Sequence, residues 1–245
     1  PRLSISAGKL KKAVFSRNMI NWQANFLVVA PRLVVDLSKS LPEGAIVKNN
    51  SHSVLRTILE FLVLFIVIFF ATQLLMKYVV SKDVVQGTSM QPTLENGERL
   101  YSVRVMQPKR NDIVVINAPD RPKSLYIKRV IGMPGDTVSA KNDKLYVNGK
   151  AIAEPYLNHK FARTEINQLA SQQGLDSSTI KFTNDFNIKT LSSTKSAKVP
   201  AGKYFVMGDN RLVSHDSRDF GFVDKSKIQS VVVWRYWPLN RLKIF

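Results

Sequence analysis

The stretch ILEFLVLFIVIFFATQLLMKYVV, residues 58–80, separates two parts of the chain that differ in composition. Its central 16 residues, 61–76, contain no charged side chain, and Glu60 and Lys77 flank them. A membrane span needs about 20 mostly apolar residues. The alternative is a buried core helix, but Phe, Leu, Ile and Val would surround this helix on all sides and leave no polar face. We therefore expect a transmembrane helix over residues 55–80.

The charges around this segment predict its orientation. The chain carries nine Lys and Arg residues through Arg56, whereas Asp36 and Glu43 are the acids that precede Glu60. Positive charge favours the cytoplasmic side of a span. We expect a single-pass protein of the cell membrane, with the N-terminus in the cytoplasm and the larger C-terminal part outside. Residues 1–54 are expected to form a cytoplasmic segment of unknown structure, and the apolar run 26–37 is too short to span.

The composition limits the possible chemistry and partners. The 245 residues contain no cysteine, which excludes disulfides and thiolate catalysis, and three histidines that lie far apart in sequence. We therefore expect neither a metal site nor a cofactor. The net charge is +18, of which +11 lies beyond residue 80, and such a field favours anionic membrane lipids or wall polymers. No basic run with interleaved aromatics occurs, so no nucleic-acid partner is expected.

Beyond residue 81 the pattern changes to short β-strands. Residues 112–118, 126–132, 203–210 and 228–237 are rich in β-branched and aromatic residues, and 144–152 reads as a hairpin about Asn148-Gly149. Residues 158–198 are polar and predict an insertion, with one helix over about 163–173 before Gly174. The expected architecture is an N-terminal transmembrane helix followed by a mostly β domain over residues 81–245.

Within this domain, GTSMQPTL (87–94) places Ser89 shortly after the span, and a serine nucleophile needs a base. His215 has Asp216 as its nearest acid, and adjacent residues are poorly placed to form a triad. The Ser-x-x-Lys matches at 6–9 and 192–195 lack companion motifs, and Gln91 breaks the G-x-S-x-G pattern.

Lys128, in YIKRVIG (126–132), is the remaining candidate base. Side chains alternate along a strand, so Tyr126 and Val130 share its face while Ile127 and Arg129 point away. We expect strand 204–207 to complete an apolar surround. Burial there would lower the pKa of Lys128 to about 8, at a cost of about 3 kcal/mol.

Three motifs, GTSMQPTL, YIKRVIGMPGD (126–136) and MGDNRLVSHDSRDFGFV (207–223), together resemble bacterial signal peptidase I, a membrane-bound Ser/Lys-dyad serine protease. The resemblance covers about residues 80–245, and a single span fits the type common in Gram-positive bacteria. It implies a LexA-like signal-peptidase β fold and an endopeptidase that cleaves signal peptides from secretory pre-proteins.

Carried onto this chain, the resemblance implies roles for individual residues. Ser89 matches the nucleophile and Lys128 the general base of an acyl-enzyme mechanism. Ser214 matches a serine that orients the lysine, and Asp216 and Arg218 match a supporting pair. The substrate would bind as an extended strand beside 84–91, with small residues, typically Ala, at the first and third positions before the cut. The expected substrate-binding residues are Gln86, Gly87, Thr88, Met90 and Tyr126.

The oxyanion hole departs from part of the family. Some members have a hydroxyl two residues before the nucleophile, but Gly87 occupies that position here. The Ser89 backbone N–H and a second, unassigned donor are expected to replace it. Two alternatives remain: a self-cleaving repressor with the same dyad, and a non-catalytic, membrane-anchored basic β domain that binds wall polymer or lipid.

Overall fold

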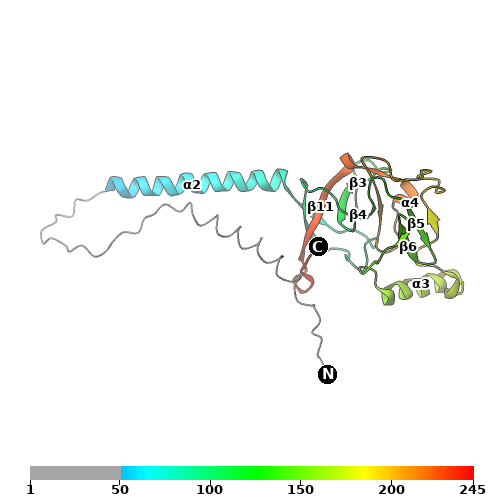
Figure 1. The fold of residues 1–245 in the computed structure, drawn as a ribbon. Coiled ribbons are helices and arrows are strands. Elements are labelled where there is room, and N and C mark those ends of the chain that lie inside the picture. Colours follow the sequence, from blue (N-terminus) through cyan, green and yellow to red (C-terminus); the bar gives the residue numbers. More distant parts are fainter. Residues whose placement is uncertain (1–50) are drawn as a thin grey trace, which may run out of the picture. The chain divides into compact units, whose positions relative to one another are not determined.

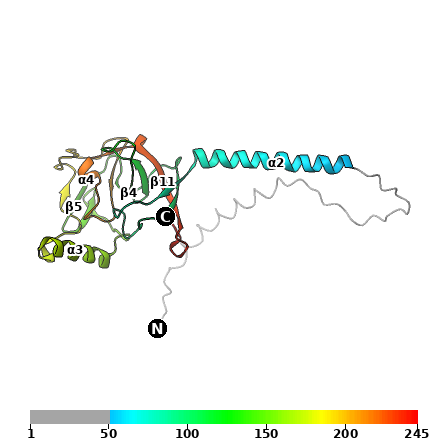
Figure 2. The same cartoon turned by 180° about the vertical axis from the view of Figure 1, so that it is seen from behind.

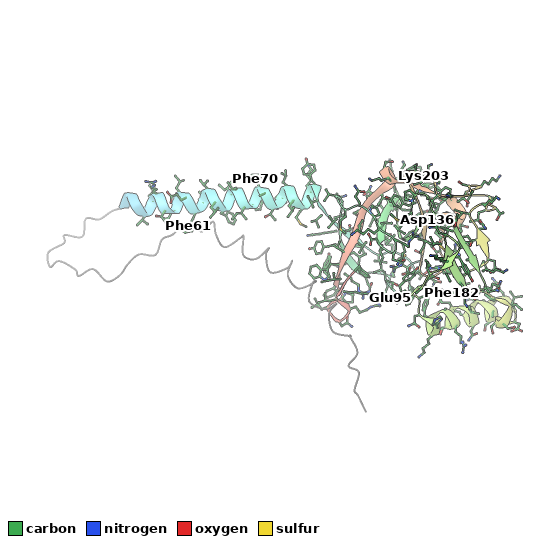
Figure 3. All side chains as sticks on the ribbon, in the orientation of Figure 1. Phe61, Phe70, Glu95, Asp136, Phe182 and Lys203 are labelled. Carbon is green, nitrogen blue, oxygen red and sulfur yellow. The ribbon has the colours of Figure 1, made fainter. Side chains whose placement is uncertain are left out.

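The computed structural model describes residues 51–245, so most of the segment expected over 1–54, including the apolar run 26–37, lies outside the described residues. The expected apolar helix is α2 (Ser51–Tyr78). Its residues 54–78 have a mean hydropathy of 2.6. At 1.5 Å per residue these 25 residues extend about 37 Å, which exceeds the roughly 30 Å of a hydrocarbon core. Phe61 and Phe70, labelled in Figure 3, are 68% and 65% exposed.

The helix ends two residues earlier than expected, because Val80 already pairs with Val103 in a β-strand. The rest of the described chain is mostly antiparallel β-structure, as predicted (Figure 1). The strands are β1 (Val80–Val84), β2 (Arg99–Val103), β3 (Ile113–Asn117), β4 (Leu125–Gly132), β5 (Val138–Lys141), β6 (Lys144–Val147), β7 (Lys150–Ala151), β8 (Phe186–Asn187), β9 (Lys203–Met207), β10 (Val223–Asp224), β11 (Ile228–Trp237) and β12 (Lys243–Ile244). The hairpin about Asn148-Gly149 joins β6 to β7, and β11 has the predicted bounds.

Two sheets make up the domain. The larger has the order β1-β2-β11-β3-β4-β9-β10, with β12 paired to β11, and the smaller has the order β7-β6-β5-β8. Strand β11 lies in the interior of the larger sheet, where it pairs with β2 on one side and β3 on the other. Side chains of both sheets meet in one core cluster, in which Ile131, Phe205 and Met207 contact Val138 and Leu145. This cluster fixes the smaller sheet against β4 and β9.

The polar insertion contains helix α3 (His159–Gln173), which lies below β5 in the views of Figures 1 and 2. The helix begins four residues before the predicted start. Asn158 provides the physical reason, because its side chain accepts hydrogen bonds from the backbone N–H groups of Lys160 and Phe161 and so caps the helix. The helix ends at Gln173, before Gly174, as predicted. Short elements follow: η1 (Ser177–Thr179), α4 (Ser217–Phe220), η2 (Lys225–Lys227) and η3 (Leu239–Arg241).

Gly132, at the end of β4, provides a test of the contact between the two sheets. A Cβ atom there would lie 2.8 Å from a methyl carbon of Val138 and 3.0 Å from Cβ of Phe205. We expect Gly132→Ala to lower the free energy of unfolding by about 1–3 kcal/mol, because the core must shift to admit the methyl group. Urea unfolding measures this change. Lys141→Ala, at the exposed end of β5, is the control, and equal midpoints for the two variants would contradict the close contact.

Candidate active site

Ser89 lies in the loop that joins β1 to β2, and two side chains of that loop anchor it. Met90 is 2% exposed and Leu94 is fully buried, and both pack with Val85 and Val115 in one apolar cluster. The backbone N–H of Leu94 donates to the Met90 carbonyl oxygen at 2.9 Å. Because these apolar anchors occupy the core, the loop holds the neighbouring Ser89 at the protein surface in a fixed position.

Lys128, on β4, reaches Ser89. Its Nζ lies 2.9 Å from Ser89 Oγ, and the lysine is only 3% exposed. It pairs with Val114 of β3, and Val114, Val130 and Val206 belong to one apolar cluster against which Tyr126 packs. The alternation along β4 therefore produces the apolar surround that the sequence predicted, with a cation inside it.

The surroundings of Lys128 change its protonation. Desolvation by burial lowers the pKa of Lys128 to about 8, from an ordinary value of about 10.5, and the nearby Asp216 carboxylate acts in the opposite direction. The Tyr126 ring lies 5.6 Å from Nζ, measured to the ring centroid. With this pKa about a tenth of Lys128 is neutral at pH 7, far more than for an ordinary lysine, and the neutral amine is the form that a general base requires.

Buried ion pairs surround the two side chains. Arg129 binds the two oxygens of Asp209 at 2.8 and 2.6 Å, which accounts for its direction away from Lys128. Arg218 binds both oxygens of Asp216 at 2.9 Å each. Asp216 also accepts a hydrogen bond from the Gly208 backbone at 3.0 Å, so the expected Asp216–Arg218 pair joins two segments of the 207–223 motif.

Ser214 is placed beside the site but lacks one expected contact. Ser214 is 7% exposed, and its Oγ has no hydrogen-bond partner within residues 51–245. The structure therefore shows no hydrogen bond from Ser214 to the Lys128 amine. The hydroxyl does lie close to Gly208, because a Cβ atom added at that glycine would be 2.1 Å from it.

Among residues 51–245, the His215 side chain forms no hydrogen bond with the side chain of Ser89 or of Asp216. Its Nε2 lies 2.6 Å from an oxygen of Asp120, and its Nδ1 lies 3.4 Å from an oxygen of Asp219. The imidazole is about half exposed and packs edge-on against Tyr126. The pair with Asp120 joins the loop between β3 and β4 to the turn that carries Ser214. No local pattern indicates this pair, because the two residues are 95 positions apart.

A cleft passes in front of Ser89 and Lys128 between two extended segments. One wall comes from β1 and the residues that follow it, and the other from the start of β4. The lining residues are Lys82 to Gly87, Ser89, Met90, Val115 and Lys123 to Lys128. Of the residues expected to bind substrate, Gln86, Gly87, Met90 and Tyr126 line this cleft, whereas Thr88 does not. The sequence analysis did not assign Ser124 or Leu125 to the cleft. Alternation along the chain places Ser124 on the same face as Lys128 and could have indicated it, whereas it places Leu125 on the opposite face.

Gly87 has a φ of +85°, in the left-handed region that side chains rarely adopt. Its N–H donates to Asn96 Oδ1 at 3.0 Å, which holds the turn. A backbone of this shape favours glycine, which explains why no hydroxyl occurs two residues before Ser89. The Ser89 N–H, by contrast, makes no hydrogen bond within residues 51–245 and is free to donate.

Comparisons with known proteins agree with this geometry. The family model described as signal peptidase, peptidase S26, matches residues 56–237. Signal peptidase IB of Staphylococcus aureus strain COL is 40% identical over 195 residues, which cover 77% of this chain and 94% of the relative. Signal peptidase I of Bacillus licheniformis is 41% identical over 165 residues, which cover 65% and 78% of the two chains.

A crystal structure of a signal peptidase I from Enterococcus faecalis V583 is 40% identical in sequence, with a TM-score of 0.42, and the match covers 52% of this chain and 97% of the other. The family match over most of the chain, together with the similarity to the Staphylococcus relative, decides the assignment. This chain belongs to the signal peptidase family, peptidase S26.

Proposed function

We propose that this chain is a membrane-bound serine endopeptidase that removes signal peptides from secretory pre-proteins, with Ser89 as nucleophile and Lys128 as general base. One observation carries the residue assignment: the 2.9 Å contact between Ser89 Oγ and the Nζ of a buried lysine whose pKa is about 8. Within residues 51–245, no other base lies in hydrogen-bond contact with Ser89 Oγ.

The mechanism follows from these two groups. Neutral Lys128 takes the proton of Ser89 as Oγ attacks the scissile carbonyl carbon. The tetrahedral intermediate collapses, the C–N bond breaks, and the Lys128 ammonium returns the proton to the leaving amine. Lys128 then removes a proton from the water that attacks the ester carbonyl of the acyl-enzyme, the C–O bond to Ser89 breaks, and the Lys128 ammonium returns the proton to Ser89 Oγ. The unpaired N–H of Ser89 supplies one oxyanion donor.

The cleft supports binding of an extended peptide. It follows the edge of β1 on one side and the start of β4 on the other, where main-chain groups can pair with a substrate strand. Gln86, Gly87, Met90 and Tyr126 remain the proposed substrate-contacting residues. Thr88 is not among the lining residues, so its proposed role is limited to the backbone of the loop. Ser214 is proposed to orient Lys128 once substrate or water enters the site.

The membrane anchor has a role in this function. Homologues of this family are membrane-anchored, and α2 has the length and composition of a span. We propose that residues 1–54 are cytoplasmic, because nine basic residues precede or begin the span, and that the domain of residues 81–245 lies outside the cell. Anchoring raises the effective concentration of the enzyme for signal peptides in the same membrane.

An apolar surface near the C-terminus supports contact with lipid. Trp237, Leu239 and Ile244 are 48%, 68% and 81% exposed, and Arg241 and Lys243 lie among them. Aromatic and aliphatic side chains beside basic ones suit the interface of an anionic membrane. These residues are the proposed site for anionic membrane lipids.

The alternative of a non-catalytic domain that binds wall polymer or lipid is not favoured. A domain of that kind requires neither a hydroxyl at Ser89 nor a cation buried at Lys128. Burial of an ammonium group that has no carboxylate in contact opposes folding. The structure nevertheless retains Lys128 in this position, beside Ser89. The self-cleaving repressor alternative is likewise not favoured, because the match to the signal peptidase family begins at residue 56 and includes most of the apolar helix.

Replacing the two groups separately tests the dyad. We expect Ser89→Ala to abolish cleavage of a pre-protein with an Ala-x-Ala site. Lys128→Ala should lower kcat/KM by about 10²–10⁴-fold, because the general base is lost. His215→Ala should keep most of the activity, since the imidazole does not contact Ser89. The rates are measured with detergent-solubilised full chain, and cleavage at the wild-type rate by Lys128→Ala would rule out the dyad.

The pKa of Lys128 predicts the pH dependence. The neutral amine is the reactive form, so kcat/KM should rise about tenfold per pH unit below about pH 8 and become constant above it. Initial rates from pH 5.5 to 10 measure this profile, with circular dichroism to confirm that the fold persists. An inflection near 10.5 would show that burial does not desolvate the lysine.

The apolar surface predicts a difference between membrane and detergent assays. We expect Leu239→Ser combined with Ile244→Ser to raise KM several-fold for a pre-protein in vesicles that contain anionic lipid. The same variant should cleave a short soluble peptide in detergent at the wild-type rate, because these residues lie outside the cleft. Equal KM values for variant and wild type in the vesicles would contradict lipid contact at this surface.

A further inference from the structure

The backbone of Ser89 is held by the turn of residues 208–214. The Asn210 N–H donates to the Ser89 carbonyl oxygen at 3.0 Å. Gly208 lies so close that an added Cβ atom would be 2.5 Å from the same oxygen. The Asn210 carbonyl oxygen accepts from the Ser214 N–H at 3.0 Å. Asn210 therefore connects the nucleophile residue to the serine beside Lys128.

The side chain of Asn210 is itself fixed from outside this turn. Asn210 is fully buried, and its Nδ2 donates to Glu165 Oε2 at 3.0 Å. Its Oδ1 has no hydrogen-bond partner within residues 51–245. Among the described residues, the side chain of Asn210 therefore forms one hydrogen bond, to Glu165, and this bond fixes its rotamer. A buried donor that loses its partner is left unsatisfied, so the turn would have to rearrange without it.

Glu165 belongs to helix α3, in the polar insertion, and α3 contributes no residue to the lining of the substrate cleft. Other contacts fix the helix in place: Asn158 caps its start, and Phe161 packs edge-on against Phe182. The next residue of the turn, Arg211, is also bound from outside the turn, by Glu154 and by Thr183 Oγ1. Residues in and just before the insertion therefore hold two successive residues of the turn.

We propose that Glu165 is a positioning residue for Ser89. This inference rests on the proposed function and extends it: α3 fixes Asn210, Asn210 fixes the Ser89 carbonyl, and the carbonyl fixes the direction of Oγ toward Lys128. Because Glu165 does not touch the cleft, its loss affects the chemical step and leaves substrate binding intact. The polar insertion is thereby part of the catalytic framework.

The test compares Glu165→Ala, Glu165→Gln and Gln168→Ala in the detergent-solubilised full chain. Alanine is the best helix former, so the first variant does not weaken α3 by propensity. Glutamine keeps an oxygen acceptor for Asn210 Nδ2. Gln168 is an exposed residue of the same helix and serves as the matched control. For each variant kcat, KM and the thermal midpoint are measured with one pre-protein.

We expect Glu165→Ala to lower kcat about tenfold with KM within twofold of the wild type, and Glu165→Gln to recover most of the loss. Gln168→Ala should match the wild type. The proposal is overturned if Glu165→Ala keeps the wild-type kcat, if the loss appears in KM alone, or if Glu165→Gln is as impaired as Glu165→Ala. An inactive wild-type protein would instead refute the proposed function, so the two failures are distinguishable.

Discussion

The burial of Lys128 is the constraint on which the site depends. An ammonium group is stable in water, and a serine hydroxyl is unreactive without a base, so neither residue has chemistry of its own at neutral pH. Moving the lysine among apolar side chains lowers its pKa to about 8 and makes the neutral amine accessible. The fold can hold the amine there because Lys128 pairs with Val114 in the interior of the larger sheet, is only 3% exposed, and directs its Nζ to Ser89 Oγ.

A lysine buried among apolar side chains must be held in place by its neighbours. Two ion pairs beside Lys128 hold the surrounding segments. Arg129 with Asp209 and Arg218 with Asp216 are each buried and each bidentate. Such pairs contribute little net stability, since desolvation offsets their attraction, but removing one partner leaves an unpaired buried charge. Their geometry therefore fixes the turn after β9 in one arrangement, with the backbone of Asn210 against Ser89.

The rest of the chain brings substrate to this arrangement. In the proposed function the apolar helix α2, which has the length and composition of a membrane span, holds the protease in the membrane from which signal peptides emerge. The exposed apolar residues after β11 are a second surface suited to lipid. In contrast, the polar insertion contributes no residue to the cleft lining, and its proposed role depends on the contact of Glu165 with Asn210.

The sequence by itself determined the apolar helix, the mostly β domain and the bounds of β11, because hydrophobic periodicity is a local signal. Ser89 and Lys128 were singled out by the resemblance of three motifs to signal peptidase I, and the structure places their side chains in contact. The sequence missed the start of α3, which depends on the Asn158 cap, and it assigned Thr88 to a cleft that Thr88 does not line. Contacts such as His215 with Asp120 and Glu165 with Asn210 were decided only by the tertiary structure. They join residues 95 and 45 positions apart, and no pattern along the chain records which exposed or insertion side chain will meet a distant turn.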